Sequence, residues 1–77
     1  GPVRVELQAT DDSGPFQVEV RSQGRTIASV RAKVAGSFPL QVSTDALPAT
    51  ITATNAAGTV ITHEITDLSL PVTLTLP

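Results

Sequence analysis

His63 is the only histidine of the chain, and histidine is the side chain best suited to acid–base or metal chemistry near neutral pH. It shares the more apolar face of a predicted strand with Ile61 and Ile65. A zinc site needs several such ligands, and the chain has neither a cysteine nor a second histidine. A catalytic triad needs a nucleophile and an orienting acid, and no motif places a serine with Asp45 or Asp67 around this histidine. We therefore expect a structural or rim-exposed histidine, no metal or other cofactor, and no enzyme activity.

The run Asp11-Asp12-Ser13-Gly14, followed by Pro15, is the densest group of hard oxygen ligands. Oxygen-rich loops of this kind suit calcium. The run lacks the alternating carboxylates of known calcium loops and a downstream glutamate, and the same residue types are strong turn formers. We favour a turn here, and a weak calcium site at Asp11-Asp12 stays open.

Composition argues against several kinds of ligand. The chain has no Trp or Tyr, and its two aromatic residues, Phe16 and Phe38, occupy positions predicted to face the core, so carbohydrate binding is not expected. The five Lys and Arg residues are scattered among seven acidic ones, and the net charge is −2, which disfavours nucleic acid as a partner. No apolar run approaches the roughly 18–20 residues of a membrane span.

The elements that would position these residues follow from a strict alternation of apolar and polar residues, first seen from Val3 to Ala9. Such alternation is typical of strands with one buried face. The predicted strands cover about Val3–Thr10, Phe16–Arg21, Thr26–Val34, Phe38–Val42, Ala49–Thr54, Thr59–Thr66 and Val72–Leu76. No segment shows a helical period, so we predict an all-β fold, a seven-stranded antiparallel β-sandwich. Residues 3–77 are expected to form one domain, with Gly1-Pro2 as the remnant of a cleaved tag.

Two residues break the alternation. Ile27 is out of phase with Ala28, Val30, Ala32 and Val34, which are predicted to share the buried face, so we expect a bulge at Ile27 or a contact on the other face. Pro39 lies inside a predicted strand and cannot donate to a ladder, so this strand should be an edge strand or be bulged. Together with His63, these two residues are the candidates for a specific interaction.

A family resemblance rests on four segments: Phe16–Val20, Val34–Leu40, Ala49–Gly58 and Pro71–Leu76. They resemble the carboxypeptidase regulatory-like domains, which are transthyretin-like sandwiches with a Gly-x-Phe-x-Leu turn and strand. The corresponding residues here are Gly36-Ser37-Phe38-Pro39-Leu40. Bacterial immunoglobulin-like domains are similar to the chain in the same way. The resemblance implies an immunoglobulin- or transthyretin-like fold and an accessory role in a secreted or surface protein.

The sequence therefore predicts a non-catalytic structural or accessory module of a larger, extracytoplasmic and bacterial protein, acting as a spacer, stabiliser or docking domain. Its expected partners are neighbouring domains or another protein. The alternative is a domain that binds a protein through an exposed sheet edge. Edge pairing uses main-chain hydrogen bonds and needs no unusual side chains.

Overall fold

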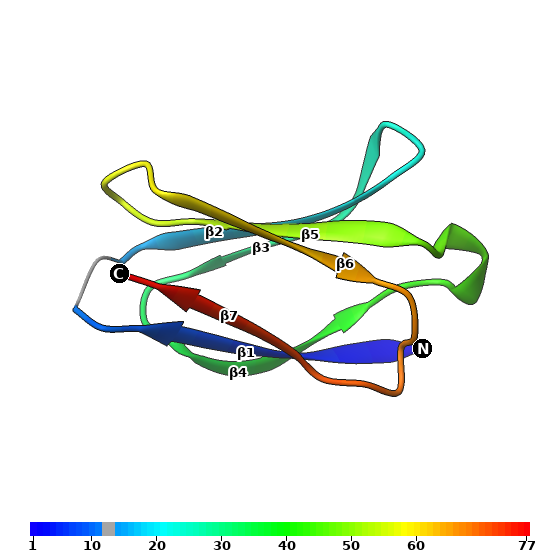
Figure 1. Cartoon of the computed structure of the whole chain (residues 1–77), viewed down its shortest axis with the longest axis horizontal. Coiled ribbons are helices and arrows are strands. Elements are labelled where there is room, and N and C mark those ends of the chain that lie inside the picture. Colours follow the sequence, from blue (N-terminus) through cyan, green and yellow to red (C-terminus); the bar gives the residue numbers. More distant parts are fainter. Residues whose placement is uncertain (12–13) are drawn as a thin grey trace.

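The computed structural model of the chain describes residues 1–11 and 14–77 (Figure 1). The described residues form seven strands and one short 3₁₀ helix. The strands are β1 (Pro2–Ala9), β2 (Phe16–Ser22), β3 (Arg25–Ala32), β4 (Gly36–Gln41), β5 (Ala49–Thr54), β6 (Val60–Ile65) and β7 (Val72–Leu76). The 3₁₀ helix η1 covers Thr44–Ala46, between β4 and β5. The predicted β5 and β7 agree with the structure in both bounds, and the other strands agree to within a few residues.

The strands form two sheets that face each other as the layers of a sandwich (Figure 1). The smaller sheet has the order β4-β1-β7, and the larger sheet has the order β3-β2-β5-β6. The all-β sandwich is confirmed. The prediction that all strands pair antiparallel is wrong for one pair, because β1 and β7 run parallel, from Val5 opposite Val72 to Ala9 opposite Leu76. A parallel pair needs a long connection, and here that connection supplies β2–β6.

The core lies between the sheets and follows the alternation read from the sequence. The smaller-sheet layer contributes Val3, Val5, Leu7, Leu40, Val42, Val72, Leu74 and Leu76, and the larger-sheet layer contributes Phe16, Val18, Val20, Ala49, Ile51, Ala53 and Ile65. None of these residues is more than 8% exposed. In the described part of the chain, each buried side-chain nitrogen or oxygen has a hydrogen-bond partner.

The predicted inner face of β3 is only partly correct. Ala28, Val30 and Ala32 are half-buried against the core, as expected of an edge strand with one covered face. Val34 was predicted to join them, but β3 ends at Ala32 and Val34 is 68% exposed. The alternation continues past the last backbone pair, so side-chain pattern alone overestimated the strand.

The bulge predicted at Ile27 is confirmed. Val20 pairs with Ala28 and the next residue, Arg21, pairs with Thr26, so Ile27 is the extra residue of β3. The extra residue shifts the alternation by one position, so that Thr26 shares the outer face of Arg21 and Ile27 has no counterpart in the register of β2. Ile27 is 39% exposed as a result, instead of lying in the core.

The edge position predicted from Pro39 is also confirmed, because β4 is a terminal strand of the smaller sheet. Gly1 and Val42 exchange both backbone hydrogen bonds, at 3.1 and 3.0 Å. Hydrogen-bonded and non-hydrogen-bonded pairs alternate along an antiparallel ladder, and this parity makes Arg4–Pro39 a non-hydrogen-bonded pair. The nitrogen of Pro39 therefore faces away from β1, where its missing hydrogen leaves the ladder intact.

Candidate functional site

The residues singled out from the sequence lie at three separate hollows of the surface, and the fold does not bring them together. Pro39 lines a hollow on the outer face of the smaller sheet, His63 lines one beside the β6–β7 connection, and Ile27 lines one beside η1. The first two hollows share Pro71, so they lie on either side of the residues that lead into β7.

The hollow at Pro39 surrounds the side chain of Arg4, which lies directly opposite it in the register of β1 and β4. Its volume is about 380 Å³. The lining combines one guanidinium with mostly apolar surface: Pro2, Arg4, Pro39, Leu68, Ser69 and Pro71. The sequence predicted the position of Pro39 but not this hollow, because its three prolines come from segments far apart in the chain.

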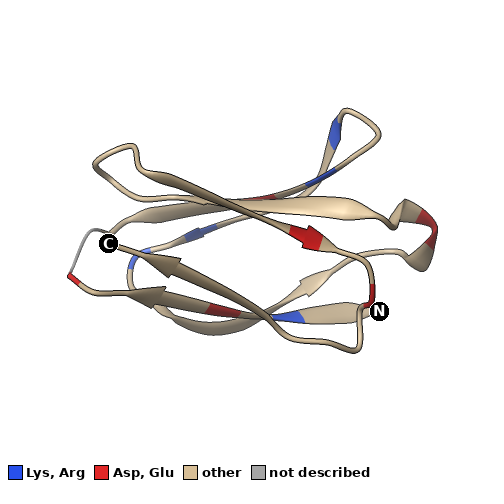
Figure 2. Ribbon diagram, viewed as in Figure 1, with Lys and Arg blue, Asp and Glu red and all other residues tan. Residues whose placement is uncertain are grey.

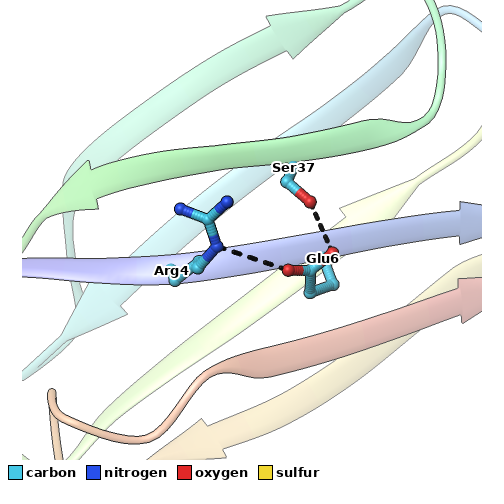
Figure 3. Close-up of polar contacts among 3 residues, drawn as sticks. All are labelled: Arg4, Glu6 and Ser37. Atoms are coloured by element: carbon cyan, nitrogen blue, oxygen red, sulfur yellow. Dashed lines mark hydrogen bonds and ion pairs between the residues drawn. The ribbon is translucent and has the colours of Figure 1, made fainter.

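Arg4 is held by a short polar chain that crosses from β1 to β4 (Figure 3). Its Nε lies 3.4 Å from Glu6 Oε1, and the hydroxyl of Ser37 donates to Glu6 Oε2. Glu6 and Ser37 face each other in the register, so this is a cross-strand contact of the kind that stabilises sheets. The side chains of Arg4 and Glu6 are 66% and 37% exposed, and ion pairs this accessible contribute at most about 1 kcal/mol. The contacts among Arg4, Glu6 and Ser37 therefore help to hold β1 and β4 in register.

His63 lies opposite Ile51 in the register, on the face of β6 that turns toward the core. The side chain is nevertheless exposed, because β6 is a terminal strand and its inner face reaches the rim of the sandwich. Glu64 and Asp67 lie on the same hollow. Among residues 1–11 and 14–77, no three His, Cys, Asp or Glu side chains form a group that could bind a metal ion.

Asp67 closes the turn that leads from β6 to β7. Its Oδ1 accepts from the backbone N–H of Ser69 at 2.9 Å and from the hydroxyl of Ser69 at 2.7 Å. These hydrogen bonds favour the carboxylate form, the side-chain bond most strongly, and so they lower the pKa of Asp67 below its ordinary value of 3.8. Asp67 therefore stabilises the turn between β6 and β7, as an aspartate commonly does in such a turn.

The bulge at Ile27 is fixed by Arg21. Its guanidinium donates to Thr26 Oγ1 and to the carbonyl of Gly24, both at 2.8 Å. These contacts bridge the β2–β3 turn on the outer face, and Ile27 borders a hollow with the loop that carries Asp45. The arrangement explains why the bulge is stable.

Charged residues are distributed over strands and loops of both layers (Figure 2). The outer face of the larger sheet also carries neutral polar contacts, with Gln17 donating to Ser29 at 2.8 Å and Thr52 lying 3.4 Å from Thr62. Phe16 is 1% exposed and Phe38 is half-buried against the core, as predicted. No helix in the described part of the chain is long and apolar enough to cross a membrane.

The calcium hypothesis at Asp11-Asp12-Ser13-Gly14 depends on Asp12 and Ser13, which lie outside the described residues.

The open edge of β6 was not identified from the sequence. Asn55 N–H donates to the carbonyl of Thr59 at 3.0 Å, and the register continues without a break from Thr54–Val60 to Ala49–Ile65. By the same alternation, the backbone groups of Val60, Thr62 and Glu64 point away from β5. Because β6 ends the sheet order, these N–H and C=O groups form an edge with no proline and no register shift.

We compared the chain with known proteins, and no family model, curated protein or solved structure matches it significantly. The resemblance to carboxypeptidase regulatory-like or bacterial immunoglobulin-like domains therefore stays a prediction.

Proposed function

We propose that this chain is a non-catalytic spacer or accessory module of a longer protein. The observation that supports this role is the position of its ends. The N- and C-termini lie toward opposite ends of the longest axis (Figure 1). The axes of the molecule measure 35, 23 and 16 Å, so a module joined through both termini adds its longest dimension to the parent.

The parallel pairing of β1 with β7 is the reason for this arrangement. The first and the last strand are neighbours that run in the same direction, so the chain enters at one end of the pair and leaves at the other. Antiparallel neighbours would return the chain to the end where it entered. The nitrogen of Gly1 also lies within the sheet, where it donates to the carbonyl of Val42.

Tandem copies of the chain, joined directly from Pro77 to Gly1, test the spacer role. We expect the maximum dimension measured by small-angle X-ray scattering to grow by about 35 Å for each copy added. The matched control carries a long Gly/Ser linker between copies, which behaves as a flexible coil and broadens the distribution of dimensions. Direct tandems that collapse side by side, with increments near the 16 or 23 Å axes, would contradict the proposal.

A second candidate function is binding of an extended peptide along β6, which the unbroken outward-facing edge favours. A partner strand there would receive main-chain hydrogen bonds from Val60, Thr62 and Glu64. Peptides selected from a random display library against the chain should shift the amide NMR signals of these three residues. Thr62→Pro removes an outward N–H and should abolish binding, whereas Thr62→Val keeps it and should bind. Selected peptides that leave the β6 amides unshifted would exclude this edge.

A further inference from the structure

The β1–β7 ladder has a mechanical consequence when the chain is pulled by its two ends. Pulling at the start of β1 and at the end of β7 drives these parallel neighbours past each other along their own axes. The hydrogen bonds between them lie across the direction of force, so they are stretched together. We propose that the chain bears tensile load and that the β1–β7 pair is its mechanical clamp, an inference that rests on the spacer role.

The backbone contacts of β1 place it between two neighbours. Gly1 and Val42 form a hydrogen-bonded pair, and every second residue of β1 follows the same orientation. The backbone groups of Val3, Val5 and Leu7 therefore face β4. The alternate residues therefore face β7. Thr10 N–H confirms this on the far side, where it donates to the carbonyl of Leu76 at 3.1 Å. β1 is thus paired with β4 from Pro2 to Leu7 and with β7 from Val5 to Ala9, and the strand cannot slide without breaking both ladders.

Side chains oppose the same movement. Leu74 and Leu76 are 0% and 1% exposed, and Thr73 and Thr75 alternate with them on the outer face. A slip of one residue turns every side chain of a strand to the other face, and it would exchange these leucines for threonines in the core. Thr75 Oγ1 also donates to Gln8 Oε1 at 3.2 Å, directly across the pair. The register of the clamp is therefore fixed by burial as well as by backbone bonds.

The direction of pulling gives a test that needs no destabilising substitution. The chain has no cysteine, so single attachment points can be introduced freely. In one arrangement, handles are fused before Gly1 and after Pro77, which loads β1 and β7 in shear. In the other, the second handle is attached at Leu70→Cys, a residue 60% exposed that precedes the start of β7, which peels the two strands apart from one end.

Single-molecule force spectroscopy should show a rupture force at least about twofold higher through the termini, because the ladder bonds are loaded together and not in succession. The Leu70→Cys variant must unfold at the same denaturant concentration as the parent chain. Equal rupture forces in the two arrangements would overturn the clamp. That result would leave the scattering test of the spacer untouched, and a collapsed tandem would leave the ratio of forces unchanged, so the two failures can be told apart.

A matched pair of prolines locates the clamp in the ladder. Gln8→Pro removes an N–H that faces β7, whereas Thr73→Pro removes one that faces the open side of β7. We expect the rupture force through the termini to fall for Gln8→Pro and to stay at the parent value for Thr73→Pro. Equal losses for the two variants would place the mechanical resistance elsewhere. If Gln8→Pro does not fold, the comparison of pulling directions still decides.

Discussion

At the level of single residues, side-chain oxygens close the turns at the two ends of β6. Asn55 precedes this strand and Asp67 follows it. Asn55 Oδ1 accepts from the N–H of Thr59 at 2.9 Å, and its carbonyl accepts from the N–H of Gly58 at 3.0 Å. Gly58 adopts the left-handed backbone conformation of this turn, with φ of +87°, and Asn55 contributes its side-chain acceptor.

Replacement of Asn55 tests this contact. Asn55 is 7% exposed, and Asn55→Ala leaves the N–H of Thr59 without its acceptor in a partly buried place. We expect the free energy of unfolding, measured by urea denaturation, to fall by about 1–3 kcal/mol. Asn55→Asp keeps an oxygen at the same position and should lose less. Equal losses in the two variants would show that the acceptor does not stabilise the turn.

The lowered pKa of Asp67 predicts a pH dependence with a defined sign. A carboxyl whose pKa is lower in the folded state stabilises the fold above its unfolded pKa, here near 3.8, and loses this effect as the pH falls through the folded value. Asp67→Asn keeps an acceptor for Ser69 but does not titrate. The melting temperature should fall less steeply for this variant between about pH 5 and pH 2, the range in which carboxyl groups titrate. Parallel declines in the two proteins would contradict the assignment.

At the level of the elements, the terminal strands differ in how they are protected from pairing with another chain. β4 carries Pro39 at an outward-facing position, and β3 carries the bulge at Ile27. Both devices hinder the addition of a further strand. β6 and β7, the other two terminal strands, have neither device. β6 presents three residues whose backbone groups point outward, Val60, Thr62 and Glu64, whereas β7 presents two, Thr73 and Thr75. This longer edge is the reason for placing peptide binding at β6.

Removal of the proline should open the edge of β4. Pro39→Val restores an outward N–H and a residue favoured in strands, so we expect concentration-dependent self-association in analytical ultracentrifugation, with little change in stability. Gln41→Val is the matched control, because it adds the same side chain to the same strand and leaves the backbone donors unchanged. Association of the control to the same extent would assign the effect to surface hydrophobicity, and not to the open edge.

At the level of the whole molecule, stability depends on one core shared by the two sheets. A chain of this length holds roughly 4–12 kcal/mol of stability in total. There is no disulfide to add to it, since the chain has no cysteine. The strands of the β1–β7 pair therefore bear load only as long as the side chains beneath them stay packed.

Leu74→Ala tests this dependence. Leu74 is 0% exposed, and its truncation should cost about 2–5 kcal/mol in chemical denaturation, a large share of the total. Val60→Ala is the matched control, since Val60 is an apolar residue of another edge strand but is 57% exposed. We expect it to change stability by less than about 0.5 kcal/mol. Comparable losses in both variants would mean that the core is not where the structure places it.

The sequence by itself determined the strands and which side of each is buried. Side-chain direction alternates residue by residue, so period two identifies a strand and its inner face from local information alone. The same rule placed β5 and β7 to the residue and located the bulge at Ile27. For the candidate site, the missing N–H of Pro39 indicated an edge strand, and the alternation showed that Ile27 departs from the pattern.

Only the tertiary structure decided which strands are neighbours and in which direction they run. The parallel β1–β7 pair, the open edge of β6 and the exposure of His63 all depend on contacts between residues far apart in the chain. Gly14 is a further example. Only a residue without a Cβ fits there, because a Cβ would lie 2.2 Å from the carbonyl oxygen of Lys33, a contact between segments distant in the chain. An alternating pattern states which face of a strand is apolar but not which strand will cover or flank it. The proposed mechanical role follows from pairing, and pairing is the property that local pattern leaves undetermined.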